Sequence, residues 1–397
     1  MRVLSDLIID GRVALSELSA IERGFHIFWL LGPFFMLIER TPGDVYILTL
    51  ALAFVFRSFK NKDLSWFHFF WVKSAFVFWM ICLVSAGLSL NSLYALGEAF
   101  VWFRFPLFVM ASAFWLGKDQ RLLYLMLAST AFALLVMCGI LTAEMATEGF
   151  KSRLTWPYGD MVPGNYLAKV GLPIIVFLSA LFLSSKGLKA AVIGGFCLLV
   201  ICMTILTGER INSLILLCAT FLTIFVCEPN WKRRFLLVGL ISLVPTIIFI
   251  TFPDYFDRHV IKFFGDIPVH KESAYYKTMM PAWLIFEEYP LLGIGVGNFR
   301  YLCSELVQSD LGLVCFNHPH NFYLQLLSEV GAVGTFLGIT FIIALVVRCY
   351  RLKAENRNVI HLVAWIIPFA LFWPIKSSAD FFGQWNNIFL WSSVALA

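Results

Sequence analysis

The chain has 397 residues, of which 60% are hydrophobic and only 14% are charged. A soluble domain carries about 25% charged residues, so this composition excludes an ordinary soluble protein. The formal net charge of +5 lies mostly in short segments between apolar runs. That distribution is typical of membrane topology signals and does not indicate nucleic-acid binding.

Apolar runs long enough to cross a bilayer recur along the whole chain, without the period-two alternation of membrane barrel strands. The sequence therefore predicts an all-α polytopic membrane protein, because backbone groups in lipid must bond within helices or closed barrels. We expect twelve spans, at 25–39, 43–57, 73–91, 94–116, 121–142, 164–184, 188–207, 211–227, 235–252, 320–347, 358–374 and 380–397. The charged segment before the first span lacks the apolar core of a cleavable signal peptide, so an amphipathic leader is expected there.

Lysine and arginine gather in alternate short loops, which sets the expected orientation. With the N-terminus in the cytoplasm, the long outside loop 253–319 holds only five basic residues. The even number of spans returns the C-terminus to the cytoplasm. The expected organisation is an N-terminal bundle of about nine spans (1–252), the outside loop with short helices (253–319) and three C-terminal spans (320–397).

Two of the nine cysteines, Cys303 and Cys315, lie in the outside loop. The other seven lie in or beside spans, where cysteine behaves as a small hydrophobic residue. Disulfides persist outside the cytoplasm, so we expect Cys303 and Cys315 to pair. The alternative is two free thiols.

The stretch "CFNHPHNFYLQLLSEVGAVG" (315–334) places polar residues at the outer end of the tenth span. Pro319 suits the first turn of a helix, which puts His318 at the cap and His320 on the first turn. A neutral imidazole is a natural general base near neutral pH, so His320 is the candidate catalytic residue. His318 is interpreted as a cap. A zinc site would need further ligands nearby, so no metal is expected.

A polar stripe continues into this span, because Asn321, Gln325 and Ser328 fall on one helix face at i, i+4 and i+7. Such a face is costly against lipid, so it must line a cavity or another helix. Asn321 and Gln325 are therefore candidate substrate-binding residues. Glycines further along favour close helix packing.

Two arginines stand where the topology disfavours them. Arg210, in "LTGERINSL", lies at an outer boundary beside Glu209; it either pairs with Glu209 or binds an anion such as a phosphate. Arg104 lies near the middle of the fourth span, six residues after Glu98. It is either a buried ion pair or a functional residue.

Two outside segments carry further candidates. The loop "RLTWPYGDMVPGN" holds Arg153 and Asp160 just before the sixth span, and Lys169 lies one turn into that span. Together with Arg210 they predict a cationic outer face that binds substrate.

The glycine run at 293–297, followed by Arg300, is no nucleotide fold, because no strand–helix unit surrounds it. It predicts a turn after a surface helix at about 273–288, with Arg300 as a further candidate for substrate binding.

In this order the motifs resemble the O-antigen ligase and O-antigen polymerase superfamily of bacterial membrane glycosyltransferases. The specific piece is "HNFYLQLLSEVGAVG", which fits the family pattern of a histidine, a small polar residue, nine residues and Gly-x-x-Gly. That pattern uses His320, Asn321, Gly331 and Gly334. The segments "GER" (208–210), "PLLGIGVGNF" (290–299) and "FFGQWNNIFLW" (381–391) are also similar to family motifs.

The resemblance implies a metal-independent, inverting transfer without cofactor at the periplasmic face of the inner membrane. The donor would be a glycan on undecaprenyl diphosphate. The acceptor would be lipid A–core for a ligase, or a lipid-linked repeat for a polymerase. His320 would activate the acceptor hydroxyl, and Arg210 would hold the diphosphate.

The family usually carries a second arginine in the long loop, and the region before the glycine turn has none here. Lys277, Lys271 and Arg258 are the candidates to replace it, and Arg104 is a further candidate diphosphate ligand. A lysine would supply the charge without the bidentate fork of arginine.

Three alternatives stay open. A polymerase would use the same site as a ligase. A transporter of lipid-linked glycan would show an internal repeat and polar residues spread through the span centres, and neither is evident. A purely structural scaffold does not account for the polar stripe at His320 or for Arg104.

Overall fold

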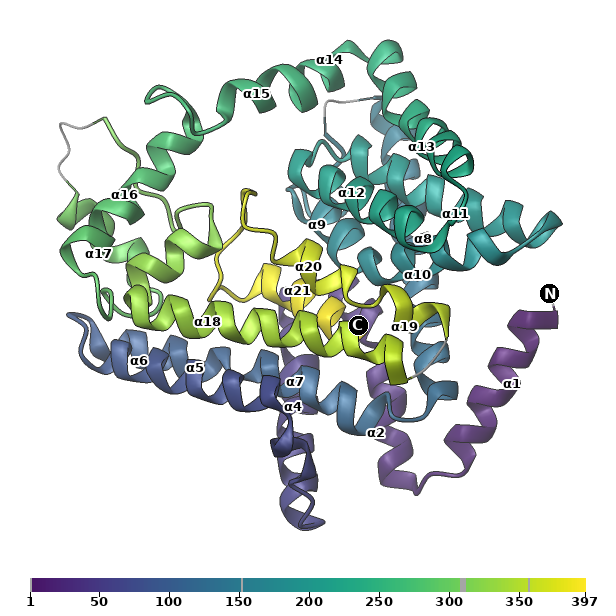
Figure 1. Cartoon of the computed structure of the whole chain (residues 1–397), viewed down its shortest axis with the longest axis horizontal. Coiled ribbons are helices and arrows are strands. Elements are labelled where there is room, and N and C mark those ends of the chain that lie inside the picture. The colour runs from purple at the N-terminus through teal and green to yellow at the C-terminus, as the bar shows by residue number, and fades with distance from the viewer. Residues whose placement is uncertain (1, 151–152, 308–311, 356–357) are drawn as a thin grey trace.

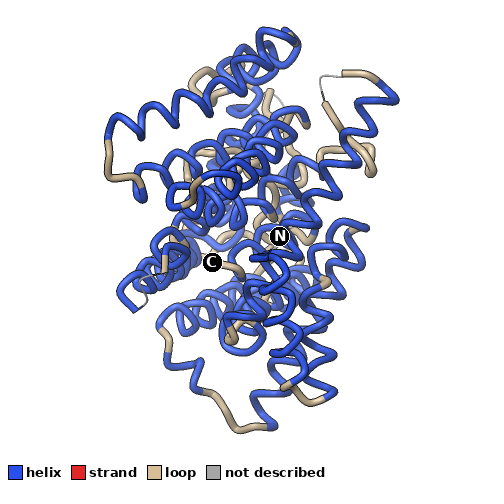
Figure 2. Tube along the Cα trace, turned by 90° about the vertical axis from the view of Figure 1, so that its right-hand side faces the viewer, coloured by secondary structure: helices blue, strands red, loops and turns tan. Residues whose placement is uncertain are grey.

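The structure is a computed structural model that describes residues 2–150, 153–307, 312–355 and 358–397. Within these ranges every regular element is a helix and no strand is present (Figure 2). The all-α prediction is therefore confirmed.

Eight helices or continuous helical runs are long and apolar enough to cross a membrane. They are α4 (Arg40–Lys60), α5 (Phe70–Gly87), α6 to η2 (Ser92–Leu116), α8 (Gln120–Glu148), α11 (Gly187–Leu206), α12 (Arg210–Cys227), α13 (Trp231–Thr251) and α18 (Phe322–Glu355). Within the third of these, α6 is Ser92–Trp102, α7 is Arg104–Ala111 and η2 is Ser112–Leu116. The chain is thus a multi-pass membrane protein by helix length and composition.

Two further helix pairs pass the same test only when each pair counts as one bent span. α2 (Ala20–Leu30) and α3 (Gly32–Ile38) meet at 48°, and α9 (Val162–Lys169) and α10 (Gly171–Ser184) meet at 40°. The count of candidate spans is therefore eight to ten, and the expected twelve are not all confirmed.

The C-terminal region differs from the two full spans expected there. It contains α19 (Val359–Val363), α20 (Ile366–Leu371) and α21 (Trp385–Ala395). The non-helical loop 372–384 joins α20 to α21. At 1.5 Å per residue none of these helices covers about 30 Å of hydrocarbon by itself. In Figure 1 α20 and α21 lie at the centre of the molecule, and the loop between them is partly exposed, with Ile375 84% exposed.

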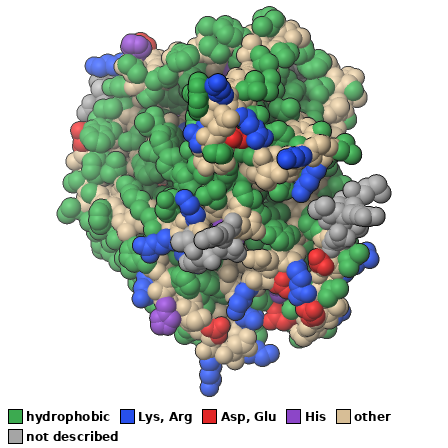
Figure 3. Space-filling view, turned by 45° about the vertical axis from the view of Figure 1, so that its right-hand side comes forward, with side chains coloured by type: hydrophobic (Ala, Val, Ile, Leu, Met, Phe, Trp, Pro, Cys, Tyr) green, Lys and Arg blue, Asp and Glu red, His purple; other side chains and the backbone are tan. Residues whose placement is uncertain are grey.

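Most helices pack around one large apolar core, and a smaller apolar cluster lies around α16 (Ala274–Glu288) and α17 (Phe299–Leu306). The most extensive contacts join α18 to α5 and α4 to α7, while α10, α11 and α12 form a second group (Figure 1). By contrast, only 6% of the apolar window of α13 is buried within the protein. A helix that is apolar all round and unburied suits lipid contact, and apolar side chains cover much of the surface in Figure 3.

The segment between α13 and α18 is built from short helices. They are α14 (Pro253–Phe256), η3 (Asp257–Ile261), α15 (Lys262–Asp266), α16 (Ala274–Glu288) and α17 (Phe299–Leu306). The remaining α-helix, α1 (Arg2–Ser16), lies at the opposite end of the chain. In Figure 1 α14 and α15 run across one side of the molecule toward α16. The helix expected at 273–288 is present as α16, with Ser273 as its N-cap. Cys303 and Cys315 form a disulfide, with their Cα atoms 5.7 Å apart.

The glycine turn at 293–297 packs against a kink in α18. Gly331 has φ +63° inside the helix, a left-handed value that favours glycine. The backbone N–H of Gly295 donates to the Glu329 carbonyl (2.8 Å), and that of Ala332 donates to the Pro290 carbonyl (2.8 Å). The two glycine motifs, far apart in sequence, therefore form one interlocked backbone contact.

We expect Gly331→Ala to destabilise the protein. A Cβ at this position would lie 2.2 Å from the Leu291 carbonyl oxygen, and the left-handed backbone adds strain of about 1–3 kcal/mol. The measurement is the melting temperature of the detergent-extracted protein by size-exclusion fluorescence. Gly139→Ala on α8 is the matched control, because nothing lies within 4 Å of its new Cβ. Equal melting temperatures for the two variants would contradict the interlock.

Candidate functional site

A cavity of about 430 Å³ gathers side chains from five separate parts of the chain. These are the start of α9 with its preceding loop, the α11–α12 turn, the segment from η3 to α16, the stretch before α18, and the loop 372–384 with the start of α21. Among the residues predicted from sequence, the lining includes Arg153, Asp160, Arg210, Arg258 and His320. The fold thus brings the candidate base and several candidate cations to one cavity.

The helix after His320 begins later than expected. α18 starts at Phe322, and the backbone N–H groups of Tyr323 (3.0 Å) and Leu324 (3.1 Å) donate to the Asn321 side-chain oxygen. Asn321 is therefore the N-cap, a role that asparagine fills well. The prediction that Pro319 and His320 lie in the first turn is wrong, because His320 adopts φ +56°, which breaks the helical path.

The two histidines lie side by side at the cavity. Their ring centroids are 4.4 Å apart, and His320 also contacts the rings of Phe316 (5.7 Å) and Tyr275 (6.4 Å). Burial lowers the pKa of His320 below its usual 6.5. Burial, followed by repulsion from His320, lowers the pKa of His318 to about 4. Both rings are therefore neutral near pH 7, and His318 lines the cavity instead of capping the helix.

The arginines meet at the turn between α11 and α12. Arg210 begins α12, and its Nη1 lies 2.8 Å from Oδ2 of Asp266 at the end of α15. The Nε of Arg258, on η3, donates to the carbonyl of Gly208 (2.7 Å). The pairing of Arg210 with Glu209, left open by the sequence, is not formed. Instead Glu209 lies 3.7 Å from Arg153. Arg210 is anchored by Asp266, a residue 56 positions away.

Two buried lysines complete the cationic lining. Lys169 ends α9 and donates to the side-chain oxygens of Asn165 (2.7 Å) and Asn386 (2.9 Å). Lys376 comes from the loop 372–384 and was not among the residues singled out from sequence. One available signal was its position in a short connection on the expected outer side, where basic residues are disfavoured.

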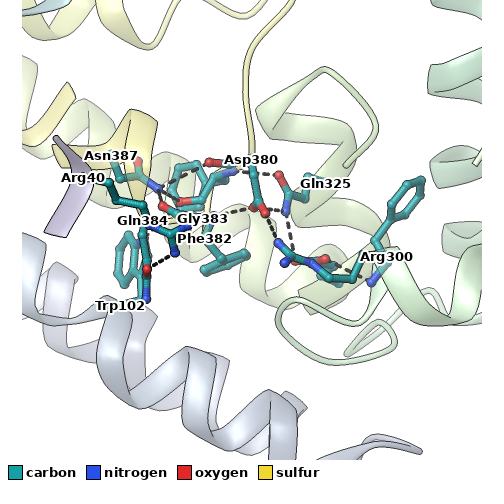
Figure 4. Close-up of polar contacts among 12 residues, drawn as sticks. Arg40, Trp102, Arg300, Gln325, Asp380, Phe382, Gly383, Gln384 and Asn387 are labelled. Atoms are coloured by element: carbon teal, nitrogen blue, oxygen red, sulfur yellow. Dashed lines mark hydrogen bonds and ion pairs between the residues drawn. The ribbon is translucent and has the colours of Figure 1, made fainter. Parts of the chain in front are cut away.

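The polar stripe at the start of α18 holds the loop 372–384. None of its side chains is among the described residues that line the cavity. Figure 4 shows Asp380 between Gln325 and Arg300. The amide of Gln325 donates to Oδ1 of Asp380 (2.6 Å), and Nη2 of Arg300 lies 2.5 Å from Oδ2 of Asp380. The Asn321 amide donates to the Lys376 carbonyl (3.2 Å). Asn321, Gln325 and Arg300 therefore hold the loop 372–384 in place, and their contact with substrate stays a prediction.

Two further candidates also lie outside the described lining of the cavity. Arg104 is buried and pairs with Asp44 on α4 (2.8 Å), not with Glu98. Lys277 pairs with Glu272 at 2.7 Å. Each charge already has a partner, and for Arg104 that partner is 60 positions away, which no local spacing could indicate.

The cavity as a whole is electropositive. Its lining carries five cations (Arg153, Lys169, Arg210, Arg258 and Lys376) and two carboxylates (Asp160 and Glu209). With neutral histidines the formal net charge is +3. Clustered cations lining one cavity favour an anionic ligand, and the arginine forks suit phosphate oxygens. Among the described residues, no three His, Cys, Asp or Glu side chains come together as metal ligands.

One known family matches the part of the chain that carries much of this site. Residues 195–339 match the sequence model of a family described as O-antigen ligase. The matched region runs from α11 into α18, so it contains Arg210, Arg258 and His320 but stops before the loop 372–384. No curated protein matches the chain. The matched region, a little over a third of the chain, is thus similar to the O-antigen ligase family.

Proposed function

We propose that the protein is an O-antigen ligase that transfers a glycan from undecaprenyl diphosphate to a sugar hydroxyl of lipid A–core. The family match supports glycosyltransferase activity of the O-antigen ligase or polymerase type. The observation that carries the proposal is the cavity itself, which places the neutral His320 imidazole in one space with a net charge of +3. A base for the acceptor and counter-charge for a diphosphate are the two requirements of this transfer.

In the proposed reaction, His320 accepts the proton of the acceptor hydroxyl as its oxygen attacks the anomeric carbon of the donor glycan. The bond between that carbon and the diphosphate oxygen breaks, and the electron pair leaves with the diphosphate. Attack opposite the leaving group inverts the anomeric configuration. Arg210 and Arg258 stabilise the charge that develops on the diphosphate, as preorganised cations do in an enclosed site. Since these cations supply the counter-charge, the proposal includes no metal ion.

The proposed location is the periplasmic face of a bacterial inner membrane, with both termini in the cytoplasm. Two observations support it: the segment 253–319 is poor in basic residues, and it holds the Cys303–Cys315 disulfide, a bond that persists in oxidising compartments. The region 1–252 contributes Arg210, the segment 253–319 contributes Arg258, and the region 320–397 contributes His320. In this organisation the site lies where the three parts meet.

Deletion of the gene in the parent bacterium tests the proposal. For a ligase, we expect lipopolysaccharide without long chains, while polymer accumulates on undecaprenyl diphosphate. Core that carries a single repeat would instead identify a polymerase that uses the same site on a lipid-linked acceptor. Donor trapped on the cytoplasmic side would identify a transporter, and an unchanged ladder of chain lengths would refute the proposed function.

A further inference from the structure

Lys376 is a buried cation that has no counter-charge among the residues the structure describes. Its side chain is only 9% exposed and lines the cavity. Among the described residues, no carboxylate lies within ion-pair distance of its ammonium and no acceptor bonds to it; its recorded contact is the ring of Phe322, 5.5 Å from Nζ. Lys169, the other buried lysine, differs because two asparagine oxygens accept from it. An unpaired buried ammonium is unfavourable unless an anion joins it.

The backbone around Lys376 is fastened to the residues that flank the candidate base. The side-chain amide of Asn321 donates to the carbonyls of Pro374 (3.0 Å) and Lys376 (3.2 Å). The N–H of Ser378 donates to the carbonyl of His320 (2.8 Å). These bonds fix the loop 372–384 against the start of α18, so Lys376 and His320 are held as parts of one unit.

The surroundings of Lys376 are more positive than negative. The charged and titratable groups that face the cavity are Arg153 and Asp160 before α9, Lys169 on α9, Glu209 and Arg210 at the α11–α12 turn, Arg258 on η3, Tyr275 on α16, and His318 and His320 before α18. Burial, followed by repulsion from Lys169, lowers the pKa of Lys376 to about 7. Both carboxylates already have partners: Glu209 lies beside Arg153, and Asp160 accepts from the backbone N–H of Val162.

We propose that Lys376 is a further donor-binding residue, whose ammonium contacts the diphosphate of the lipid-linked glycan from the side of the base. This inference rests on the proposed function and names a residue outside the segment that matches the family. The diphosphate enters a site that already holds Arg210 and Arg258, and it supplies the counter-charge that Lys376 lacks. The loop 372–384 thereby couples donor binding to the position of His320.

A pH-dependent donor affinity follows from this contact. The donor diphosphate is esterified at both ends and does not titrate near neutrality. Its charge favours the protonated lysine, so binding takes up a proton wherever the free side chain is neutral. Because the free lysine loses its proton as the pH rises past about 7, the apparent donor KM should increase up to tenfold per pH unit above that point. The two histidines take up protons only at lower pH, so they do not contribute to the change in donor KM above pH 7.

The test is the donor KM of membranes that contain Lys376→Met or Lys376→Arg. We expect Lys376→Met to raise the donor KM about 10-fold or more, with the acceptor KM unchanged. Arginine stays protonated, so Lys376→Arg should retain donor binding but lose the increase in KM with pH. Lys262→Met is the matched control, because Lys262 is exposed and pairs with Asp257 on the outer segment. A donor KM unchanged by Lys376→Met, or a pH profile shared by wild type and Lys376→Arg, would overturn the inference.

A measurement on the wild-type protein covers the case in which Lys376→Met does not fold. An amine-acetylating reagent at pH 7.5 should modify Lys376 readily, since its pKa is low, and undecaprenyl diphosphate should protect it, as followed by mass spectrometry. Lys262 should be acetylated equally with and without the lipid. Equal acetylation of Lys376 with and without the lipid would count against the contact. Failure of wild type to use any lipid-diphosphate donor would instead refute the proposed function.

Discussion

Replacement of His320 by alanine should reduce glycan transfer by about 10²–10⁴-fold, the usual contribution of a general base. The side chain faces the cavity and is only half-buried, so its removal should leave the amount of folded protein unchanged. His320 has φ +56°, a conformation that asparagine tolerates better than alanine. His320→Asn is therefore the cleaner variant, because it removes the base while keeping the backbone. Near-normal transfer by His320→Asn would eliminate His320 as the base.

The pH profile adds a second readout for the same residue. Burial lowers the pKa of His320 below 6.5, which keeps the imidazole unprotonated to lower pH. Activity should therefore persist as the pH falls past 6.5 and decline only as it passes through the lowered pKa of His320. His318, with a pKa near 4, should leave this limb in place when replaced by asparagine. An acid limb centred above 6.5 in wild-type membranes would contradict a buried, neutral base.

Local sequence signals predicted the long helices closely and the C-terminal region poorly. The span expected at 188–207 is α11 (Gly187–Leu206), and that at 211–227 is α12 (Arg210–Cys227). In both segments, the apolar periodicity and the flanking polar residues indicate the same helix bounds. The span expected at 380–397 begins only at Trp385, because Asp380 bonds to Arg300 and Gln325 and holds the preceding residues in a loop. Those partners are 80 and 55 positions away, beyond any local pattern.

The site shows the same division between local and distant determinants. Sequence reasoning found His320, Arg210 and Arg258, which the structure gathers at one cavity. It named Gln325 as a substrate contact because a polar stripe must face something polar, and Arg300 because it follows the glycine turn. In the structure both side chains bond to Asp380. It missed Lys376, whose significance depends on burial without a partner, a property that exists only once the loop 372–384 is folded against His320.

The proposed contact of the two arginines with the donor diphosphate gives the second large effect. Arg210 uses one nitrogen for Asp266, and Arg258 uses its Nε for the Gly208 carbonyl. A guanidinium has five N–H donors, so both keep donors for phosphate oxygens. Each charge-assisted hydrogen bond is worth about 2 kcal/mol, which corresponds to roughly 30-fold.

We therefore expect Arg210→Met and Arg258→Met each to raise the donor KM by about 30-fold and the double variant to abolish measurable transfer. Arg12→Met, an exposed position on α1, is the control for loss of one positive charge. The variants also separate charge from geometry, because lysine keeps the charge but not the fork. If the fork matters, Arg210→Lys should recover only part of the donor affinity lost in Arg210→Met. Arg258 is one candidate to fill the role of the second loop arginine that the resemblance implies, so a donor KM unaffected by Arg258→Met would leave that role to the lysines of the cavity.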